Sequence, residues 1–209
     1  FHRNEWKQGS LQGFYDQTSH RFQDWFLKRH IGPIEELEQL WRKSPEQYHT
    51  IVEIGCGAGQ VIQYLGKRFP QAKRLVGLDV CTEQIQANIR SNACERTEYY
   101  DGNAGEWITE HARPNTVIVS NGGVLEHFSP QELEELFTRT RSLSPSMMIT
   151  IEPIARDHKI ETDFTSRPFG NERSFSHNYP YRLIEAGFAI EFQDEVMTDE
   201  YRFLLILAT

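Results

Sequence analysis

The chain has 209 residues, of which 38% are hydrophobic and 25% charged, proportions typical of a globular protein with a substantial core. The formal net charge is −8 and Lys and Arg form no long run, which argues against a broad nucleic-acid-binding surface. No apolar run approaches the roughly 20 residues of a membrane-spanning helix. The three cysteines form no CxxC pair, and the histidines show no HExxH spacing. We therefore expect a reduced, cytoplasmic chain with no membrane span, disulfide or metal site.

The first 49 residues have the apolar spacing of helices. One apolar cluster contains Trp25, and a second pattern opens at Pro33 and continues with Ile34, Leu37, Leu40 and Trp41. We predict that residues 1–49 form an N-terminal helical cap or lid and that residues 50–209 form the main domain.

From residue 50 onward, short apolar runs alternate with helical patterns. A capping box begins a helix at Ser129, a second helix spans Gln60–Phe69, and Asn178 or Tyr179 caps a short helix that ends before Gly187. The predicted strands between such helices are Thr50–Ile54, Arg74–Asp79, Thr97–Tyr100, Thr116–Ser120 and Met147–Ile151. This alternation indicates βαβ units and a mainly parallel sheet.

Two last strands, Phe188–Glu195 and Tyr201–Ala208, are joined by a link too short for a crossover and must pair antiparallel. The predicted fold is therefore α/β: a Rossmann-like, seven-stranded, mainly parallel sheet with a C-terminal antiparallel hairpin and helices on both faces. Residues 153–176 are polar and irregular, and we predict that they form an inserted substrate loop.

A glycine loop follows the first predicted strand. Gly55, Gly57 and Gly59 have GxGxG spacing, not the GxGxxG of dinucleotide-binding proteins, because position 60 is Gln. Glu53 precedes the loop, and Asp79 ends the next strand at the distance where a carboxylate can accept hydrogen bonds from ribose hydroxyls. These residues predict a nucleoside-containing ligand at the carboxyl ends of the strands.

Three segments now point to one family. Val52–Gly59 and Val76–Asp79 resemble the first two motifs of the class I S-adenosylmethionine (SAM) methyltransferases, and Val119–Phe128 resembles the segment after their fourth strand. The likeness covers Thr50 to about Glu152 well and is strongest to the small-molecule branch, which includes the ubiquinone-type and other metabolite methyltransferases. It implies SAM as cofactor and S-adenosylhomocysteine (SAH) as product.

The resemblance also implies roles for individual residues. Glu53 would organise the loop and the methionine amino group, Asp79 would hold the ribose, and Asn103 would lie at the adenine amino group, where the family more often has Asp. Tyr15 would belong to a lid over the cofactor. The full set of implied cofactor-binding residues is Glu53, Gly55, Cys56, Gly57, Gly59, Asp79, Val80, Gly102, Asn103, Ala104, Asn121 and Tyr15.

Methyl transfer needs a base only if the acceptor is protonated. His127 and His177 are the candidate catalytic bases, because both are expected next to the cleft, with Glu126 and Glu152 as alternatives. For each histidine a structural role, in orienting a loop or capping a helix, stays open.

The leading hypothesis is a methyltransferase that acts on an oxygen or nitrogen of a small metabolite. The alternatives are a non-catalytic SAM-binding partner subunit and a methyltransferase that acts on a protein. An NAD-linked oxidoreductase is disfavoured by the GxGxG spacing and by the absence of Tyr-x-x-x-Lys after the fourth strand. The sequence leaves the acceptor and the oligomeric state open.

Overall fold

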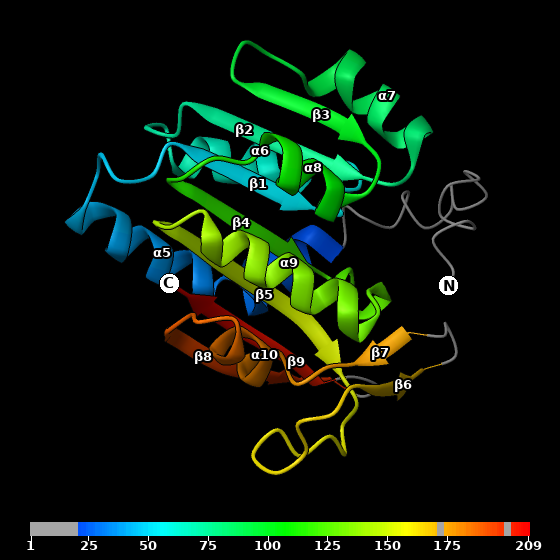
Figure 1. Ribbon diagram of the computed structural model, residues 1–209. Helices are drawn as coiled ribbons and strands as arrows, with labels where there is room; N and C mark the ends of the chain where they lie inside the picture. Colours follow the sequence, from blue (N-terminus) through cyan, green and yellow to red (C-terminus); the bar gives the residue numbers. More distant parts are fainter. Residues whose placement is uncertain (1–20, 171–173, 199–201) are drawn as a thin grey trace.

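The computed structural model describes residues 21–170, 174–198 and 202–209, so the predicted lid residue Tyr15 lies outside the described residues (Figure 1). A seven-stranded sheet forms the centre, with the strand order β3-β2-β1-β4-β5-β9-β8. Its strands are β1 (Thr50–Ile54), β2 (Arg74–Asp79), β3 (Thr97–Asp101), β4 (Thr116–Asn121), β5 (Ser146–Ile154), β8 (Ile190–Met197) and β9 (Arg202–Ala208).

Five strands run parallel and the C-terminal pair does not. The strands β1 to β5 pair in parallel, whereas β9 is antiparallel to both β5 and β8. This confirms the predicted fold class and the terminal hairpin. Strand β5 extends to Ile154, three residues beyond the predicted end, because β9 pairs with it as far as Ile154 and Arg202.

Helices cover both faces of the sheet. The capping box at Ser129 and Glu132 is present, and the Asn178 side chain accepts from the Tyr181 N–H, as the sequence patterns predict. The helices are η1 (Arg21–Phe26), α4 (Leu27–Arg29), α5 (Gly32–Lys43), α6 (Gln60–Arg68), α7 (Thr82–Asn92), α8 (Ala104–His111), η2 (Leu125–His127), α9 (Pro130–Ser142) and α10 (Tyr179–Glu185).

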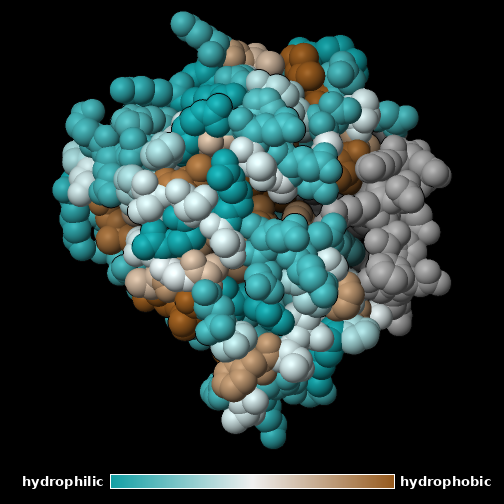
Figure 2. All heavy atoms as spheres, viewed as in Figure 1, coloured by the Kyte–Doolittle hydropathy of each residue, from teal (hydrophilic) through white to brown (hydrophobic). Residues whose placement is uncertain are grey.

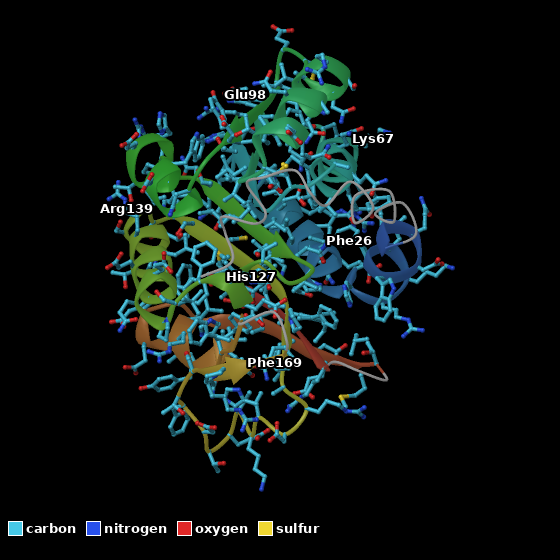
Figure 3. All side chains as sticks on the ribbon, turned by 90° about the vertical axis from the view of Figure 1, so that its right-hand side faces the viewer. Phe26, Lys67, Glu98, His127, Arg139 and Phe169 are labelled. Atoms are coloured by element: carbon cyan, nitrogen blue, oxygen red, sulfur yellow. The ribbon has the colours of Figure 1, made fainter. Side chains whose placement is uncertain are left out.

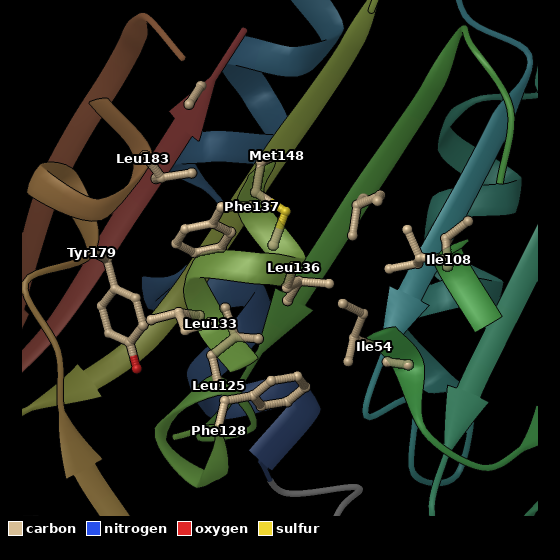
Figure 4. Close-up of a cluster of buried hydrophobic side chains, with 14 of the residues drawn as sticks. Ile54, Ile108, Leu125, Phe128, Leu133, Leu136, Phe137, Met148, Tyr179 and Leu183 are labelled. Carbon is tan, nitrogen blue, oxygen red and sulfur yellow. The ribbon is translucent and has the colours of Figure 1, made fainter. Parts of the chain in front are cut away.

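Each face of the sheet has its own apolar core. On the face shown in Figure 4, residues of α8, α9 and α10 such as Ile108, Phe137 and Leu183 pack over alternate strand residues. On the other face α5, α6 and α7 supply residues such as Trp41 and Leu65. Strand residues alternate between the two cores because successive side chains point to opposite faces.

Helix α5 is part of this second core layer. It packs against β8 and β9, and a Cβ on Gly32 would lie only 2.8 Å from the ring of Phe192. The segment predicted as an N-terminal cap therefore contains a helix that covers the sheet, together with residues 1–20, which lie outside the described residues.

The segment predicted as an irregular insertion contains a short antiparallel ribbon of β6 (Arg167–Phe169) and β7 (Ser174–Ser176). Buried His158 organises it: its Nδ1 lies 2.7 Å from Ser176 Oγ and its Nε2 lies 3.2 Å from the Asp163 carbonyl oxygen. These contacts join residues 5 and 18 positions apart, so local sequence did not reveal them.

The face visible in Figure 2 is mostly hydrophilic, with hydrophobic residues in small separate groups. Within the described ranges, no helix combines the length and the apolar character that crossing a bilayer requires.

Candidate functional site

The candidate site lies where the strand order reverses. Strand β1 is flanked by β2 and β4, and the helices that follow β1 and β3, α6 and α8, cover opposite faces of the sheet. Open α/β sheets bind ligands at the carboxyl ends of the strands at such a switch point. Figure 3 looks toward this edge of the sheet, with His127 near the centre.

The glycine loop adopts backbone angles that favour glycine. Gly55, Gly57 and Gly59 have φ values of 70°, 46° and 75°. At Gly55 the space is also closed, since an added Cβ would lie 2.3 Å from Val124 Cγ2. The loop after β1 therefore packs directly on the turn after β4.

Asp79 ties the glycine loop to the end of β2. Its carboxylate accepts from the Gly57 N–H and from the Cys81 N–H, each at 2.9 Å. Burial raises the pKa of Asp79, while these N–H groups oppose the rise. Asn88 on α7 also holds the loop by donating to the Gly57 carbonyl oxygen at 2.7 Å. The carboxylate is thus oriented before a ligand arrives.

Glu53 is buried beneath the loop. Its Oε2 has no hydrogen-bond partner among the described residues. Burial raises the pKa of Glu53 well above its ordinary value, the Ile62 N–H opposes this rise and the Asp79 charge adds to it. Such a carboxyl group has an unused acceptor that a cationic group could satisfy.

Cys56 is also buried, and burial raises the pKa of its thiol well above the ordinary value. A Cβ on Gly77 of β2 would lie 2.9 Å from Cys56 Sγ. The thiol therefore packs against β2 and is unsuited to act as a nucleophile.

The turn after β3 differs in detail from the expectation. Asn103 Oδ1 accepts from the N–H groups of Gly105 at 2.8 Å and Glu106 at 3.2 Å, and so caps α8. The side-chain oxygen of Asn103 is therefore engaged within the chain and is not free to accept from an adenine amino group. Gly102 has φ 134° and an open space where a Cβ would lie, and its N–H donates to the Asp79 carbonyl oxygen. Ala104 is buried and Val80 is half-buried.

The turn after β4 is held by Glu152, which lies on β5 and is fully buried. One carboxyl oxygen accepts from Ser120 Oγ at 2.5 Å, and the other accepts from the N–H groups of Val124 at 2.9 Å and Leu125 at 3.1 Å. Sequence reasoning gave Glu152 only an alternative role as a base, because the motif after β4 carries no sign of its partner on β5.

The two candidate histidines have different surroundings. His177 is fully buried: its Nε2 donates to the Phe128 carbonyl oxygen at 3.0 Å and its Nδ1 lies 2.7 Å from Ser166 Oγ. Burial lowers the pKa of His177 to about 4. The ring therefore bridges the insertion and η2, which favours a structural role. His127 is half-buried on η2, beside Glu126.

His30 is a polar residue of this region that the sequence analysis did not single out. It is buried between the N-terminal helices and the sheet, 4.7 Å from the Phe203 ring, and burial lowers its pKa to about 4, with the Asn121 side chain acting in the opposite direction. Neither His30 Nε2 nor Asn121 Oδ1 has a well-formed hydrogen bond among the described residues. No motif marks His30, since only tertiary packing brings it to β4.

Two hollows lie on the described surface. One, of about 460 Å³, is lined by Trp25, Arg29, Arg156, Met197 and Thr198, near the ends of β5 and β8. The other, of about 680 Å³, lies beside the starts of β2 and β3, at the opposite edge from the glycine loop. Only the first is on the side of the sheet where ligands of this fold bind.

These residues fit a SAM-type cofactor. A buried carboxyl oxygen of Glu53 lacks a partner among the described residues, Gly55, Gly57 and Gly59 of the loop carry no side chain, and Asp79 is oriented at the end of β2. Among the described residues, no group of three or more His, Cys, Asp or Glu side chains could hold a metal ion.

Comparison with known proteins agrees with this geometry. Residues 51–145 match the family model described as a methyltransferase domain. The chain is 27% identical over 145 residues to trans-aconitate 2-methyltransferase of Mycobacterium tuberculosis, covering 69% of this chain and 49% of the relative. It is 32% identical over 118 residues to the Rhodopseudomonas palustris protein of that name, covering 48% and 44%. The chain thus spans about half the length of the curated relatives it matches.

A solved structure extends the likeness to the whole fold. Magnesium protoporphyrin IX methyltransferase of Synechocystis, solved with bound SAH, superposes with a TM-score of 0.62 at 14% identity, covering 99% of this chain and 97% of that one. Residues 51–145 are therefore similar to a methyltransferase domain, and the chain has the fold of that solved structure.

Proposed function

We propose that this chain transfers a methyl group from SAM to an oxygen or nitrogen of a small metabolite. The observation that carries the proposal is the convergence of Glu53, the glycine loop and Asp79 at the switch point of the sheet. The similarity of residues 51–145 to a methyltransferase domain supports it.

Each of these groups would have its own task toward SAM. The unpartnered Glu53 oxygen would accept from the methionine amino group, whose positive charge would stabilise the carboxylate. Asp79 would accept from the ribose hydroxyls with the lone pairs that Gly57 and Cys81 leave free. Because Asn103 Oδ1 caps α8, contact with adenine would come from its amide NH₂ or from backbone groups near Ala104.

SAM supplies a methyl group already activated on a sulfonium. The chain then has to hold the acceptor in line with that group and to exclude water, and such positioning provides effective molarities of roughly 10⁵ M or more. If the acceptor is protonated, half-buried His127 would be the base, because both ring nitrogens of His177 lie within hydrogen-bonding distance of groups within the chain.

A small acceptor is supported by two observations. The named relatives methylate trans-aconitate, a small molecule. The hollow of about 460 Å³ has the size of a small-molecule site and carries Arg29 and Arg156 on its wall.

The test has two parts. Calorimetry should show SAH binding and no response to NAD, and a labelled methyl group should pass from SAM to a member of a panel of small carboxylic acids that includes trans-aconitate. SAH binding without transfer to any small molecule or protein would favour the non-catalytic subunit, and transfer only to protein would favour the protein-directed alternative. Binding of NAD in place of SAH would overturn the proposal.

A further inference from the structure

The carboxyl group of Glu152 joins the end of β4 to the start of η2. Its donors are the Ser120 hydroxyl at the end of β4 and the N–H groups of Val124 and Leu125 at the start of η2. Glu152 lies one residue beyond Ile151, the partner of Asn121 in the β4–β5 ladder. A single buried side chain thus satisfies three donors at the point where the pairing of β4 with β5 ends.

The segment between these donors depends on that side chain for its shape. Gly122 and Gly123 have φ values of 88° and 90°, and the Gly122 N–H donates to the Ile151 carbonyl oxygen at 2.9 Å. Without Glu152, the Val124 and Leu125 N–H groups would lose their acceptor in a buried place, at the desolvation cost of unpaired donors.

Val124 carries this arrangement to the glycine loop. Its side chain occupies the space where a Cβ on Gly55 would lie, at 2.3 Å and 2.7 Å from its two methyl groups. Gly55 begins the loop whose next glycine, Gly57, donates to Asp79. A displacement of the turn after β4 would therefore remove the support of the loop after β1.

We propose that Glu152 is a positioning residue for the donor site, whose carboxyl group holds the turn after β4 so that Val124 fixes the glycine loop in its ligand-binding shape. The proposal rests on the proposed function for its link to SAM, and its link to the turn stands on the hydrogen bonds alone.

The site of Glu152 also makes this role dependent on pH. Burial raises the pKa of Glu152 to about 8; the Ser120 hydroxyl opposes the rise, the Glu126 charge adds to it, and the N–H groups oppose it. Among the described residues, Tyr179 on α10 also faces this pair: burial raises its pKa, and the Glu152 and Glu126 charges add to the rise. A carboxylate accepts hydrogen bonds more strongly than a carboxylic acid, so the turn is held more firmly above about pH 8.

The experiment measures SAH affinity by calorimetry from pH 6.5 to 9.5 for the wild type, Glu152→Gln and Glu152→Ala. Glutamine keeps an acceptor for the two N–H groups and stays neutral, so E152Q should match the wild type near pH 6.5. The wild-type to E152Q affinity ratio should then rise on the order of threefold through pH 8. This ratio removes the titration of Glu53, Asp79 and SAH itself.

E152A should lose on the order of tenfold in SAH affinity at every pH, because both N–H groups lose their acceptor. The matched control is Thr150→Val, two residues earlier on the same strand, where a buried hydroxyl has no partner among the described residues. T150V should bind SAH as the wild type does. A flat wild-type to E152Q ratio, or wild-type affinity in E152A, would overturn the proposal.

A second readout needs no cofactor. In the free protein, the amide resonances of Val124 and Leu125 should titrate with a midpoint near pH 8 in the wild type and stay constant in E152Q. If they do not titrate, the hold on the turn is refuted. If these resonances titrate but no variant binds SAH, the link to the donor site fails together with the proposed function. If SAH binds but the resonances do not titrate, the proposed function stands and the role of Glu152 is refuted.

Discussion

The two sides of the switch point hold their polar groups by pairs that are distant in the sequence, and they differ in whether a motif marks those pairs. On the β1–β2 side, Asp79 binds the N–H groups of Gly57 and Cys81 next to a glycine loop of recognisable spacing. On the β4–β5 side, Glu152 binds residues 27 to 32 positions away and His177 binds a carbonyl group 49 positions away. The pairs of the first side involve residues of a recognisable motif, whereas no motif marks the pairs of the second side.

This contrast also separates the proposed donor site from the proposed acceptor site. The β1–β2 side presents groups that would all bind SAM. The β4–β5 side, the N-terminal helices and the insertion bring together residues from separate parts of the sequence. We expect substitutions on the first side to change cofactor affinity. Substitutions on the second side should change stability and turnover, except at Glu152, which also supports the glycine loop through Val124. Four measurements test that division.

His177→Ala should have the largest effect. It removes a fully buried ring and leaves Ser166 and the Phe128 carbonyl group without their partner, so the free energy of unfolding should fall by about 2–4 kcal/mol. Turnover should fall more than SAH affinity, which should stay within about threefold. Urea denaturation and calorimetry measure both. Wild-type stability with lost turnover would instead support a catalytic base.

Asp79→Ala should weaken SAH binding by roughly tenfold or more, equivalent to about 1.4 kcal/mol. The variant loses the acceptor for the ribose and frees the Gly57 N–H from its partner. Asp194→Ala, on exposed β8, is the matched control and should bind as the wild type does. An unchanged dissociation constant for the Asp79 variant would contradict the placement of the donor site.

Glu152→Gln should change how stability depends on pH. The pKa of Glu152 is about 8 in the folded chain, raised from an ordinary value of 4.5 for a solvated glutamate, so the folded chain holds an extra proton between these values. The wild type should therefore lose about 1.4 kcal/mol of stability relative to E152Q per pH unit as pH rises through this window. Urea denaturation at pH 5.5 and 6.5 measures the difference. Parallel pH profiles would show that Glu152 is ionised throughout.

Asn103→Ala should have the smallest effect. Removing the helix cap should cost about 1 kcal/mol of unfolding free energy, because the Gly105 and Glu106 N–H groups lose their acceptor. SAH affinity should fall no more than about threefold if the cap is the main task of the side chain. Asn103→Ser keeps a capping oxygen and should restore stability. A much larger loss of affinity would indicate direct contact with adenine.

Much of the fold followed from local patterns. The apolar runs, the capping box at Ser129 and the short link before β9 determined the strands, several helices and the terminal hairpin, because burial on both faces and helix caps require particular residues at close spacing. The GxGxG spacing and Asp79 placed the donor site for the same reason: glycine angles and a carboxylate at a strand end are local requirements.

Only the tertiary structure decided the partners of the buried polar groups. It placed α5 in the core under the sheet, brought His30 to Asn121, used Asn103 to cap α8, and assigned Glu152 to the turn that supports Gly55. These outcomes depend on desolvation and on donors that meet across the sheet, so the sequence by itself determined which residues could ionise or donate, and packing determined which of them met.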